Sequence, residues 1–355
     1  SGTPVSIQSD DVIINGFEIT APDHNRGMVC GDISDMSVEF NKIYNIGTNL
    51  TGDQGSGVIA FVYTVPNASA NTNVAVTDNC FNDIGSSSVT FDSPSAISIL
   101  QSTSTGTLTD LYIERNTIDN VNVHTGDWDT EGGRIAYGII LNTGGGSGYL
   151  TTDGKIVNAS IKNNEISNLT GFIATGIGLE GNTENAVVTN NDVSNLTAYK
   201  TADRTGGGYD LQGLKFENNR YVSTCTVEEN AFRTDTYTHD GTTPRGYAVA
   251  NYVPTGGSYT GGTTGSATVT CNWLGTADYD EIVDNASLTG KILNKAGCQT
   301  IFQPYLADGT DASTDIGFQP VTPTPCATDP VAIISAVPEH EKCGVLGSIT
   351  VTWQN

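Results

Sequence analysis

One pattern recurs eight times along the chain and constrains its fold more than any other feature. Eight asparagines are each preceded by Val or Ile three residues earlier and followed by an apolar residue two positions later. They are Asn15, Asn41, Asn79, Asn116, Asn164, Asn191, Asn230 and Asn272. Alternating apolar and polar positions indicate a short strand with one buried face. The sequence therefore predicts a repeated unit of one strand and a turn at Asn.

A third apolar column lies five residues before the asparagine. Seven of the eight repeats keep it, and only Asp10 departs from it. Asn tolerates the left-handed backbone region, and its amide bonds readily to nearby backbone, so we expect it to form the corner itself. Asparagines stacked in successive coils can also hydrogen-bond to one another in a ladder.

The distance between successive repeats varies, although the repeated unit does not. The spacings are 26, 38, 37, 48, 27, 39 and 42 residues. A second apolar run follows within most repeats, as in IAYGIIL from residue 135 and GYAVANY from residue 246. Constant strands joined by loops of variable length are typical of a stacked solenoid. The prediction is an all-β, right-handed parallel β-helix of about eight coils, covering residues 1–320.

The repeats also resemble a known family. The segments VEFNKIYNI, IERNTIDNV, IKNNEISNL and VTNNDVSNL are similar to the parallel β-helix repeat of pectate-lyase-like proteins. The stretch that begins CNWLGTADYDEI resembles the closing segment of β-helix domains in large secreted or cell-surface proteins of Bacteroidetes-type bacteria. This resemblance covers residues 4–320. It implies the fold and an extracellular or cell-surface location, and leaves the activity open because the scaffold carries lyases, hydrolases and adhesins.

The C-terminal part of the chain has a different character. Residues 321–330 are rich in proline and are expected to form an extended linker. Residues 331–355 contain two strand-like runs, which indicate the start of a truncated β-sandwich-like module or a tail docked on the solenoid. Both ends of the chain are interpreted as cuts in a longer polypeptide.

Charge narrows the choice of partners. The chain has 15 Lys and Arg against 39 Asp and Glu, a formal net charge of −24. Nucleic acids and anionic lipid require clustered positive charge, so we expect no nucleic-acid partner. No apolar run approaches the length of a membrane span, so we expect no membrane insertion.

The seven cysteines are dispersed and form no C-x-x-C pair. Together with the low lysine content, this favours an extracellular protein with one to three disulfides. The pairs Cys271–Cys298 and Cys326–Cys343 are plausible, but spacing alone does not decide them.

Long loops point to a candidate binding surface. Connections at residues 21–31, 122–134, 197–208 and 233–246 are long, and the register places them along one edge of the solenoid. Long insertions on one face of a repeat protein are often its binding face, although solvent-exposed loops of no function are the alternative. The candidate ligand-binding residues are His124, Trp128, Arg134, Tyr199, Arg204, Tyr237 and His239.

Within this edge, Asp127, Asp129 and Glu131 alternate around Trp128. Three carboxylates could hold calcium, a hard cation that prefers oxygen ligands, and an exposed Trp could stack on a sugar ring. The segment lacks the glycine and the distal glutamate of a complete EF-hand loop. A calcium site, a glycan contact and an inert acidic loop all stay open.

No catalytic set stands out, so the catalytic residues are unknown. Glu114 and Lys162 face outward on adjacent coils and are expected to form a surface ion pair, and the separation of Asp235 and Asp240 near His239 is not defined. We expect a non-catalytic structural or adhesive segment, with polysaccharide or cell-surface glycan as partner. The alternatives are a polysaccharide lyase or glycoside hydrolase of the parallel β-helix type, and a phage tailspike.

Overall fold

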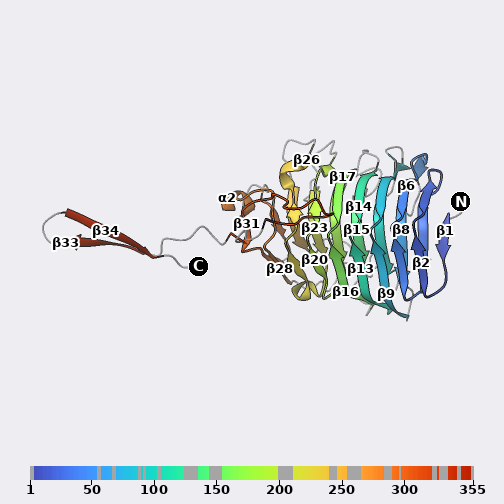
Figure 1. Ribbon diagram of the computed structural model, residues 1–355, viewed down its shortest axis with the longest axis horizontal. Helices are drawn as coiled ribbons and strands as arrows, with labels where there is room; N and C mark the ends of the chain where they lie inside the picture. Colours follow the sequence, from blue (N-terminus) through green and yellow to red (C-terminus); the bar gives the residue numbers. More distant parts are fainter. Residues whose placement is uncertain are drawn as a thin grey trace.

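The computed structural model describes most of the chain. The described residues are 4–53, 57–65, 69–86, 89–90, 93–101, 105–123, 135–143, 154–198, 211–239, 246–253, 265–283, 290–295, 297–321, 326–327, 335–341 and 345–352. Within them, three parallel sheets wind into a right-handed parallel β-helix, as the repeats predict. Figure 1 shows the strands stacked in chain order from β1 to β28.

Each turn of the helix is called a rung below. The first seven rungs contribute one strand each to sheets A, B and C, and the last two contribute strands to sheets A and B. Sheet A contains β1 (Val5–Ile7), β4 (Arg26–Gly31), β8 (Ile59–Val65), β12 (Ser95–Gln101), β15 (Ile135–Asn142), β18 (Ile173–Glu180), β23 (Leu211–Glu217), β27 (Gly246–Tyr252) and β29 (Ile292–Asn294). Sheet B contains β2 (Val12–Asn15), β5 (Met36–Glu39), β9 (Ala70–Thr77), β13 (Thr107–Glu114), β16 (Lys155–Lys162), β20 (Val187–Thr189), β24 (Thr226–Glu228), β28 (Ser266–Thr270) and β30 (Gln299–Ile301). Sheet C contains β3 (Glu18–Ala21), β6 (Lys42–Ile46), β10 (Cys80–Ile84), β14 (Thr117–Asn122), β17 (Glu165–Gly171), β21 (Asp192–Val193) and β25 (Ala231–Phe232).

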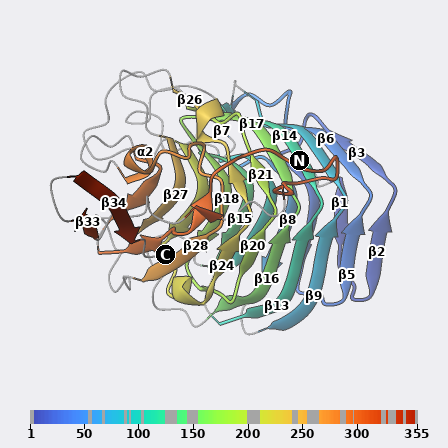
Figure 2. The same ribbon diagram turned by 60° about the vertical axis from the view of Figure 1, so that its left-hand side comes forward.

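Short strands and helical turns are present in addition to the main strands of the three sheets (Figure 2). The small strands are β7 (Gly52–Asp53), β11 (Val89–Thr90), β19 (Thr183–Glu184), β22 (Thr197–Ala198), β26 (Thr238–His239), β31 (Tyr305–Leu306) and β32 (Cys326–Ala327). The helical turns are η2 (Val222–Thr224), η3 (Thr234–Thr236) and α2 (Tyr279–Val283). β31 pairs antiparallel with β32, and β33 (Ser335–Glu341) pairs antiparallel with β34 (Val345–Thr352). The boundaries at residues 320 and 330 stay predictions.

The apolar columns read from the sequence form the core. Val76, Ile113 and Ile161 occupy the same position on β9, β13 and β16, and all three are fully buried. The apolar residues two positions after the asparagine are also fully buried, and Phe81, Ile118 and Ile166 lie in register. Branched and aromatic side chains suit these positions because each packs against its counterparts on the neighbouring rungs.

A continuous asparagine ladder runs along the corner between sheets B and C. The side-chain oxygen of Asn79 accepts bonds from the backbone nitrogen of Asn41 at 3.0 Å and from its side-chain amide at 3.1 Å. The same paired contact repeats through Asn116, Asn164, Asn191, Asn230 and Asn272. The ladder expected from the sequence is therefore confirmed for seven of the eight asparagines.

The corner differs from the expectation in one respect. The residue before each ladder asparagine, not the asparagine itself, adopts the left-handed conformation. These residues are Phe40, Asp78, Arg115, Asn163, Asn190, Glu229 and Cys271, with φ between 53° and 58°. The asparagine is needed for its amide, which bonds rungs on both sides, whereas the preceding residue makes the turn.

The first rung shows a register error in the sequence prediction. Val12 and Ile14 pair with Met36 and Val38, so Asn15 lies opposite Glu39 and outside the ladder. Phe17 holds the ladder position instead, and its backbone nitrogen donates to the side-chain oxygen of Asn41 at 3.0 Å. Phe17 was expected to point inward, but 56% of its surface is exposed.

A ninth rung, without the asparagine signature, follows the predicted eight. β29 and β30 extend sheets A and B beyond β27 and β28. In this rung Tyr305 takes the ladder position, because the backbone nitrogen of Leu306 bonds to the oxygen of Asn272 at 2.9 Å. The ladder thus lies between two aromatic residues, Phe17 and Tyr305.

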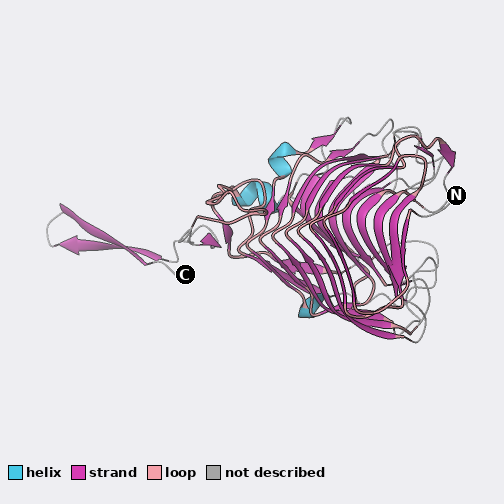
Figure 3. Ribbon diagram, turned by 45° about the vertical axis from the view of Figure 1, so that its right-hand side comes forward, coloured by secondary structure: helices cyan, strands magenta, loops and turns pink. Residues whose placement is uncertain are grey.

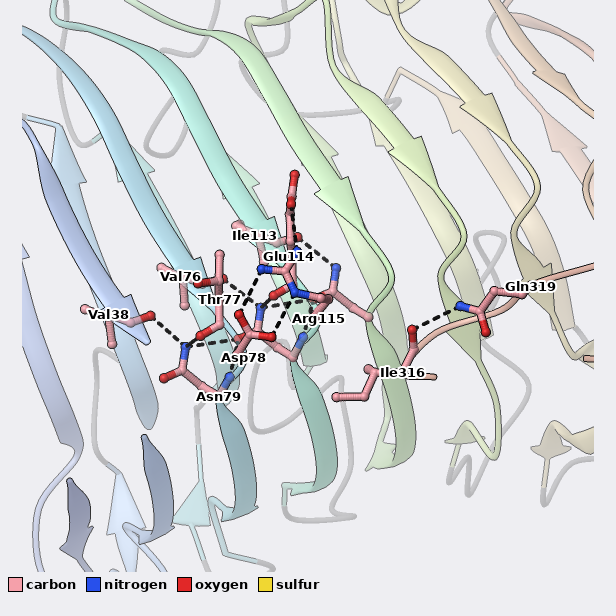
Figure 4. Close-up of polar contacts among 12 residues, drawn as sticks. Val38, Val76, Thr77, Asp78, Asn79, Ile113, Glu114, Arg115, Ile316 and Gln319 are labelled. Atoms are coloured by element: carbon pink, nitrogen blue, oxygen red, sulfur yellow. Dashed lines mark hydrogen bonds and ion pairs between the residues drawn. The ribbon is translucent and has the colours of Figure 1, made fainter. Parts of the chain in front are cut away.

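Residues 307–321, called the return segment, fold back along the B–C corner. The backbone nitrogen of Phe318 bonds to the oxygen of Asn190 at 2.8 Å, and the Asn190 side chain donates to the oxygen of Phe318 at 3.1 Å. Phe318 is fully buried beside Ala231 and Leu306. Figure 4 shows part of this segment, Ile316 and Gln319, in the same close-up as the Asp78–Arg115 ion pair of the corner.

The free cysteines exclude one of the two disulfide pairs considered from the sequence. Cys30, Cys80, Cys225 and Cys298 carry free thiols. The pair Cys271–Cys298 is therefore ruled out, and the three remaining cysteines allow at most one disulfide within the chain. The pair Cys326–Cys343 lies outside the described side chains.

Candidate functional site

Polar side chains gather on the outer face of sheet A, away from the main core (Figure 3 shows the sheets). Glu180 and Glu217 end the neighbouring strands β18 and β23 and lie in register with each other. Lys215 lies two residues before Glu217 on the same face. Tyr252 continues the register of Glu217 on β27, and Tyr137 comes from β15. We call these five residues the Lys215 cluster.

Lys215 is the centre of the cluster. Its ammonium forms an ion pair with Glu180, contacts Glu217 Oε2 at 3.0 Å and donates to the Tyr137 hydroxyl at 3.0 Å. The Lys215 side chain is 2% exposed, whereas that of Glu217 is 22% exposed. An ammonium has three donors, so these contacts use all of them.

The carboxylates are held by further donors. Glu180 Oε1 accepts a bond from the Tyr137 hydroxyl at 3.2 Å, and Glu180 Oε2 accepts one from Asn142 Nδ2 at 2.7 Å. The Tyr252 hydroxyl donates to Glu217 Oε2 at 3.0 Å. The cluster is therefore a connected network in which each charged group has partners.

Local sequence makes room for this network. Gly178 lies in register between Ile140 and Lys215. A Cβ at Gly178 would lie 2.6 Å from Ile140 Cδ1 and 3.6 Å from Lys215 Cε. A residue without a side chain at this position lets the long Lys215 chain lie flat over the strand.

Burial and charge set the protonation of the cluster. Burial raises the pKa of Glu180, although Lys215 partly offsets this effect. Burial alone would lower the pKa of Lys215, but Glu180 and Glu217 hold that pKa well above its usual value. Burial also raises the pKa values of Tyr137 and Tyr252. Lys215 is thus a permanent cation, unsuited to act as a base.

Most of the residues proposed from the sequence lie outside the described residues. This holds for His124, Trp128, Arg134, Tyr199 and Arg204, and for the calcium candidates Asp127, Asp129 and Glu131. The strands around their loops are described: 124–134 connects β14 to β15, and 199–210 connects β22 to β23. Both loops thus join sheet C to sheet A. Whether their side chains form one surface stays a prediction.

Two proposed residues can be placed. The backbone of His239 pairs with Ala198 on β22. Tyr237 packs against the core, its ring is in reach of Gly246, and its hydroxyl lies beside Gly213. Burial raises the pKa of Tyr237 well above its usual value. The Tyr237 hydroxyl therefore faces the interior and not the expected ligand surface.

The outward column on sheet B has the predicted register, with Glu114 opposite Lys162. The expected ion pair does not form, because Glu114 accepts a bond from Ser160 Oγ at 2.6 Å and pairs with Arg115 at 3.2 Å. Among the described residues, no group of three or more His, Cys, Asp or Glu side chains is arranged to hold a metal ion. In the same part of the chain, no helix is long and apolar enough to cross a bilayer.

Sequence reasoning missed the Lys215 cluster. The strand LQGLKFE at 211–217 was not recognised as a sheet A strand, so Lys215 and Glu217 were not compared with Glu180. The available signal was the shared spacing of GIGLE at 176–180 and GLKFE at 213–217.

Comparisons with known proteins give no relative from which a function could be carried over. No family model, curated protein or solved structure matches this chain.

Proposed function

We propose that the protein is a rigid, non-catalytic β-helix module of a secreted or cell-surface bacterial protein, and that it binds neutral glycans. The observation that carries this proposal is the closed state of the Lys215 cluster. All three donors of Lys215 are engaged by Glu180, Glu217 and Tyr137. A lysine held this way stabilises the fold and offers neither a base nor a free cation to a substrate.

The remaining framework supports a mechanical role. The asparagine ladder joins seven successive rungs, and the core columns are closed on each of them. Hydrogen bonds to both neighbouring rungs resist shear between them, and closely packed buried side chains resist bending. A rod with these properties is suited to hold a binding surface away from its point of attachment.

The glycan preference rests on charge and on the sheet C to sheet A loops. A net charge of −24 repels polyuronates but does not disfavour neutral sugars. The loop at 124–134 contains Trp128, whose ring offers a flat apolar face for a sugar. The carboxylates of Asp127 and Asp129 make calcium the alternative ligand of this loop.

A glycan array and calorimetry with calcium test this proposal. Trp128→Ala should abolish glycan binding and leave any calcium binding unchanged, whereas Asp127→Ala with Asp129→Ala should do the reverse. Tyr44→Ala, a change outside the loop on strand β6, serves as the aromatic control. Binding that is equal in all variants would reject the loop as the site.

A glycoside hydrolase is the second candidate, and one observation favours it. Glu180 and Glu217 contact one nitrogen atom, so these oxygens are no farther apart than the roughly 5–5.5 Å of retaining glycosidases. Burial raises the pKa of Glu180, as a general acid requires. Glu217, the more exposed of the two, would meet the sugar as nucleophile.

Release of reducing sugars from a polysaccharide panel decides between the two functions. Loss of this release in both Glu180→Gln and Glu217→Gln would establish the hydrolase. The Glu184→Gln variant, on β19, is the control because Glu184 pairs with Lys155 outside the cluster. No release by the wild-type protein from any polysaccharide, combined with specific glycan binding, is the result expected here.

A further inference from the structure

The turn between sheets A and B in the sixth and seventh rungs contains several enclosed polar side chains. In the sixth rung Thr183 is fully buried on the short strand β19. In the seventh rung Asn218 and Asn219 follow β23, and each is 4% exposed. We call these three residues the amide corner. Polar side chains this far from solvent normally have hydrogen-bond partners.

Backbone hydrogen bonds join the sixth and seventh rungs directly at the amide corner. The nitrogen of Gly181 bonds to the oxygen of Glu217 at 3.0 Å, and the nitrogen of Arg220 bonds to the oxygen of Gly181 at 3.1 Å. The residues after β18 and those after β23 are therefore stacked one rung apart.

Cys225 ties the side chains together. Its thiol lies 3.7 Å from the backbone oxygen of Thr183. Burial raises the pKa of Cys225 to about 11, and the Asn219 side chain, which lies near the thiol without forming an aligned hydrogen bond, is among the groups that lower this pKa. Thr183 and Asn219 thus adjoin the same thiol from consecutive rungs.

Four polar atoms of the amide corner have no hydrogen-bond partner in the protein. They are Thr183 Oγ1, Asn218 Oδ1, Asn218 Nδ2 and Asn219 Nδ2. The other amide atom of Asn219, Oδ1, accepts a bond from the backbone nitrogen of Tyr221 at 2.9 Å. Orphaned polar atoms are individually unfavourable, so four of them in one turn indicate a ligand that supplies partners.

The mixture of atoms defines the chemistry of that ligand. Two amide nitrogens need acceptors, an amide oxygen needs a donor, and the threonine hydroxyl can serve either way. A metal ion would satisfy only the oxygens, and an anion would satisfy only the nitrogens. A hydroxyl group both donates and accepts.

We propose that the amide corner is a binding site for neutral hydroxyl groups, occupied by internal water. Two sources of hydroxyl fit the same atoms, water and a small polyol or sugar. Water is favoured because Thr183, Asn218 and Asn219 are all enclosed. Internal waters of this kind typically make about three hydrogen bonds each.

The direction in which a single substitution shifts the melting temperature tests the site. Thr183→Val keeps the shape of the side chain and suits a strand, but removes the orphaned hydroxyl. If a bound hydroxyl pairs with Thr183 Oγ1, the variant should melt lower by about 2 °C, since a lost hydrogen bond destabilises. If Thr183 Oγ1 has no partner at all, removing it should raise the melting temperature or leave it unchanged, and the proposal fails.

Thr175→Val is the matched control. Thr175 is also fully buried on a strand, but its hydroxyl already donates to Gln212 Oε1 at 3.3 Å. The Thr175→Val variant should therefore have a lower melting temperature because it loses this hydrogen bond within the protein, with no ligand involved. A drop in both variants supports the proposal, and a drop in Thr175→Val alone contradicts it.

A second measurement identifies the ligand and does not depend on stability. Magnetic relaxation dispersion of water oxygen-17 should show long-lived waters that are lost in Asn218→Gly. Glycine tolerates the positive φ of 53° at this position and removes the whole amide. Loss of the water signal on adding glycerol would assign the site to polyols. A wild-type signal that is unchanged in Asn218→Gly would overturn the site.

Discussion

The side-chain oxygen of Asn116 accepts two hydrogen bonds from Asn79, one from its backbone nitrogen and one from its side-chain amide, both at 3.1 Å. Asn116 in turn donates to the backbone oxygen of Val76 at 2.8 Å and to Asn164 Oδ1 at 3.0 Å. A single side chain therefore bonds to the rungs on either side of its own. This relationship carries the first prediction.

Replacing Asn116 with Ala should destabilise the protein by about 2–4 kcal/mol. The change leaves the buried nitrogen of Asn79 and the buried oxygen of Val76 without partners, and each orphan is unfavourable by about 1–3 kcal/mol. Urea unfolding measures the loss. Asn49→Ala is the control, because Asn49 makes an exposed bond to Asp23 and its loss should matter by less than about 0.5 kcal/mol. Similar losses in both variants would show that the ladder is not a source of stability.

Ile161→Asp should destabilise the protein by more than about 3 kcal/mol, because it buries a carboxylate without a partner. Ile161 is fully enclosed between Ile113 and Val188 of the adjacent rungs. Thr189→Asp places the same charge one residue after Val188, on the outward side of β20. Thermal melting should separate the two variants clearly. A wild-type midpoint for Ile161→Asp would contradict the inward assignment.

Lys215→Met should lose about 3–5 kcal/mol at neutral pH, because it leaves Glu180 and Glu217 without their shared cation. The pKa of Glu180, already raised by burial, should rise further in the folded variant. A carboxyl whose folded pKa lies above its unfolded pKa binds its proton more tightly in the native state. The native state therefore gains stability as pH falls through the folded pKa.

Urea unfolding at pH 8 and at pH 5 measures this effect. The loss of unfolding free energy in Lys215→Met, relative to the wild type, should be smaller at pH 5. The double variant Glu180→Gln with Lys215→Met should show a flatter profile, since the titrating carboxyl is gone. An equal deficit at both pH values would mean that Glu180 does not titrate in the cluster.

The free thiols should react with a thiol reagent in a defined order. Cys80 is only partly buried, whereas Cys30, Cys225 and Cys298 are buried. Burial also raises the pKa of Cys30, which keeps it as the unreactive thiol. One fast-reacting thiol from this group is expected in the native protein, and it should disappear in Cys80→Ser. Fast labelling of Cys30 would be inconsistent with its buried position.

Phe318→Ala should release the return segment without unfolding the solenoid. Phe318 packs against Trp273 and lies under the guanidinium of Arg233, whose centre is 5.8 Å from the ring. Removing a buried Phe leaves a cavity and typically destabilises by about 3–5 kcal/mol, here mainly at the segment itself. Limited proteolysis should cut within residues 307–321 in the variant and not in the wild type. Ile316→Ala, at a partly exposed position, is the control.

The fold could be predicted because its determinants repeat. Columns such as Val76, Ile113 and Ile161 appear in the sequence at a constant offset from the asparagine, and the structure places them in register. The first rung could not be aligned correctly, because Val12, Ile13 and Ile14 form an uninterrupted apolar run and Phe17 replaces the ladder asparagine. The ninth rung was missed for a similar reason, since Tyr305 holds the ladder position there.

The polar cluster was missed because most of its contacts join different rungs. Tyr137 and Lys215 are 78 residues apart, yet a hydrogen bond of 3.0 Å connects them. Their proximity depends on the register of three sheet A strands, β15, β18 and β23, and an error in one strand separates them. Tyr237 was wrongly predicted to be exposed for a different reason. It belongs to a long connection between strands, and its packing against Gly213 is evident only from the structure.

The asparagine ladder also fixes the register of successive rungs. A slip of one residue in a strand would exchange its buried and exposed faces, and loops of very different length offer many chances for such slips. Seven successive rungs nevertheless present one amide at the ladder position, so a slip made in one loop is not carried past the ladder into the next rung. The length of a connecting loop is thereby uncoupled from the alignment of the strands it joins. Segments such as 144–153 and 254–264 can therefore be exchanged or lengthened as separate parts, with the rungs on either side kept in step.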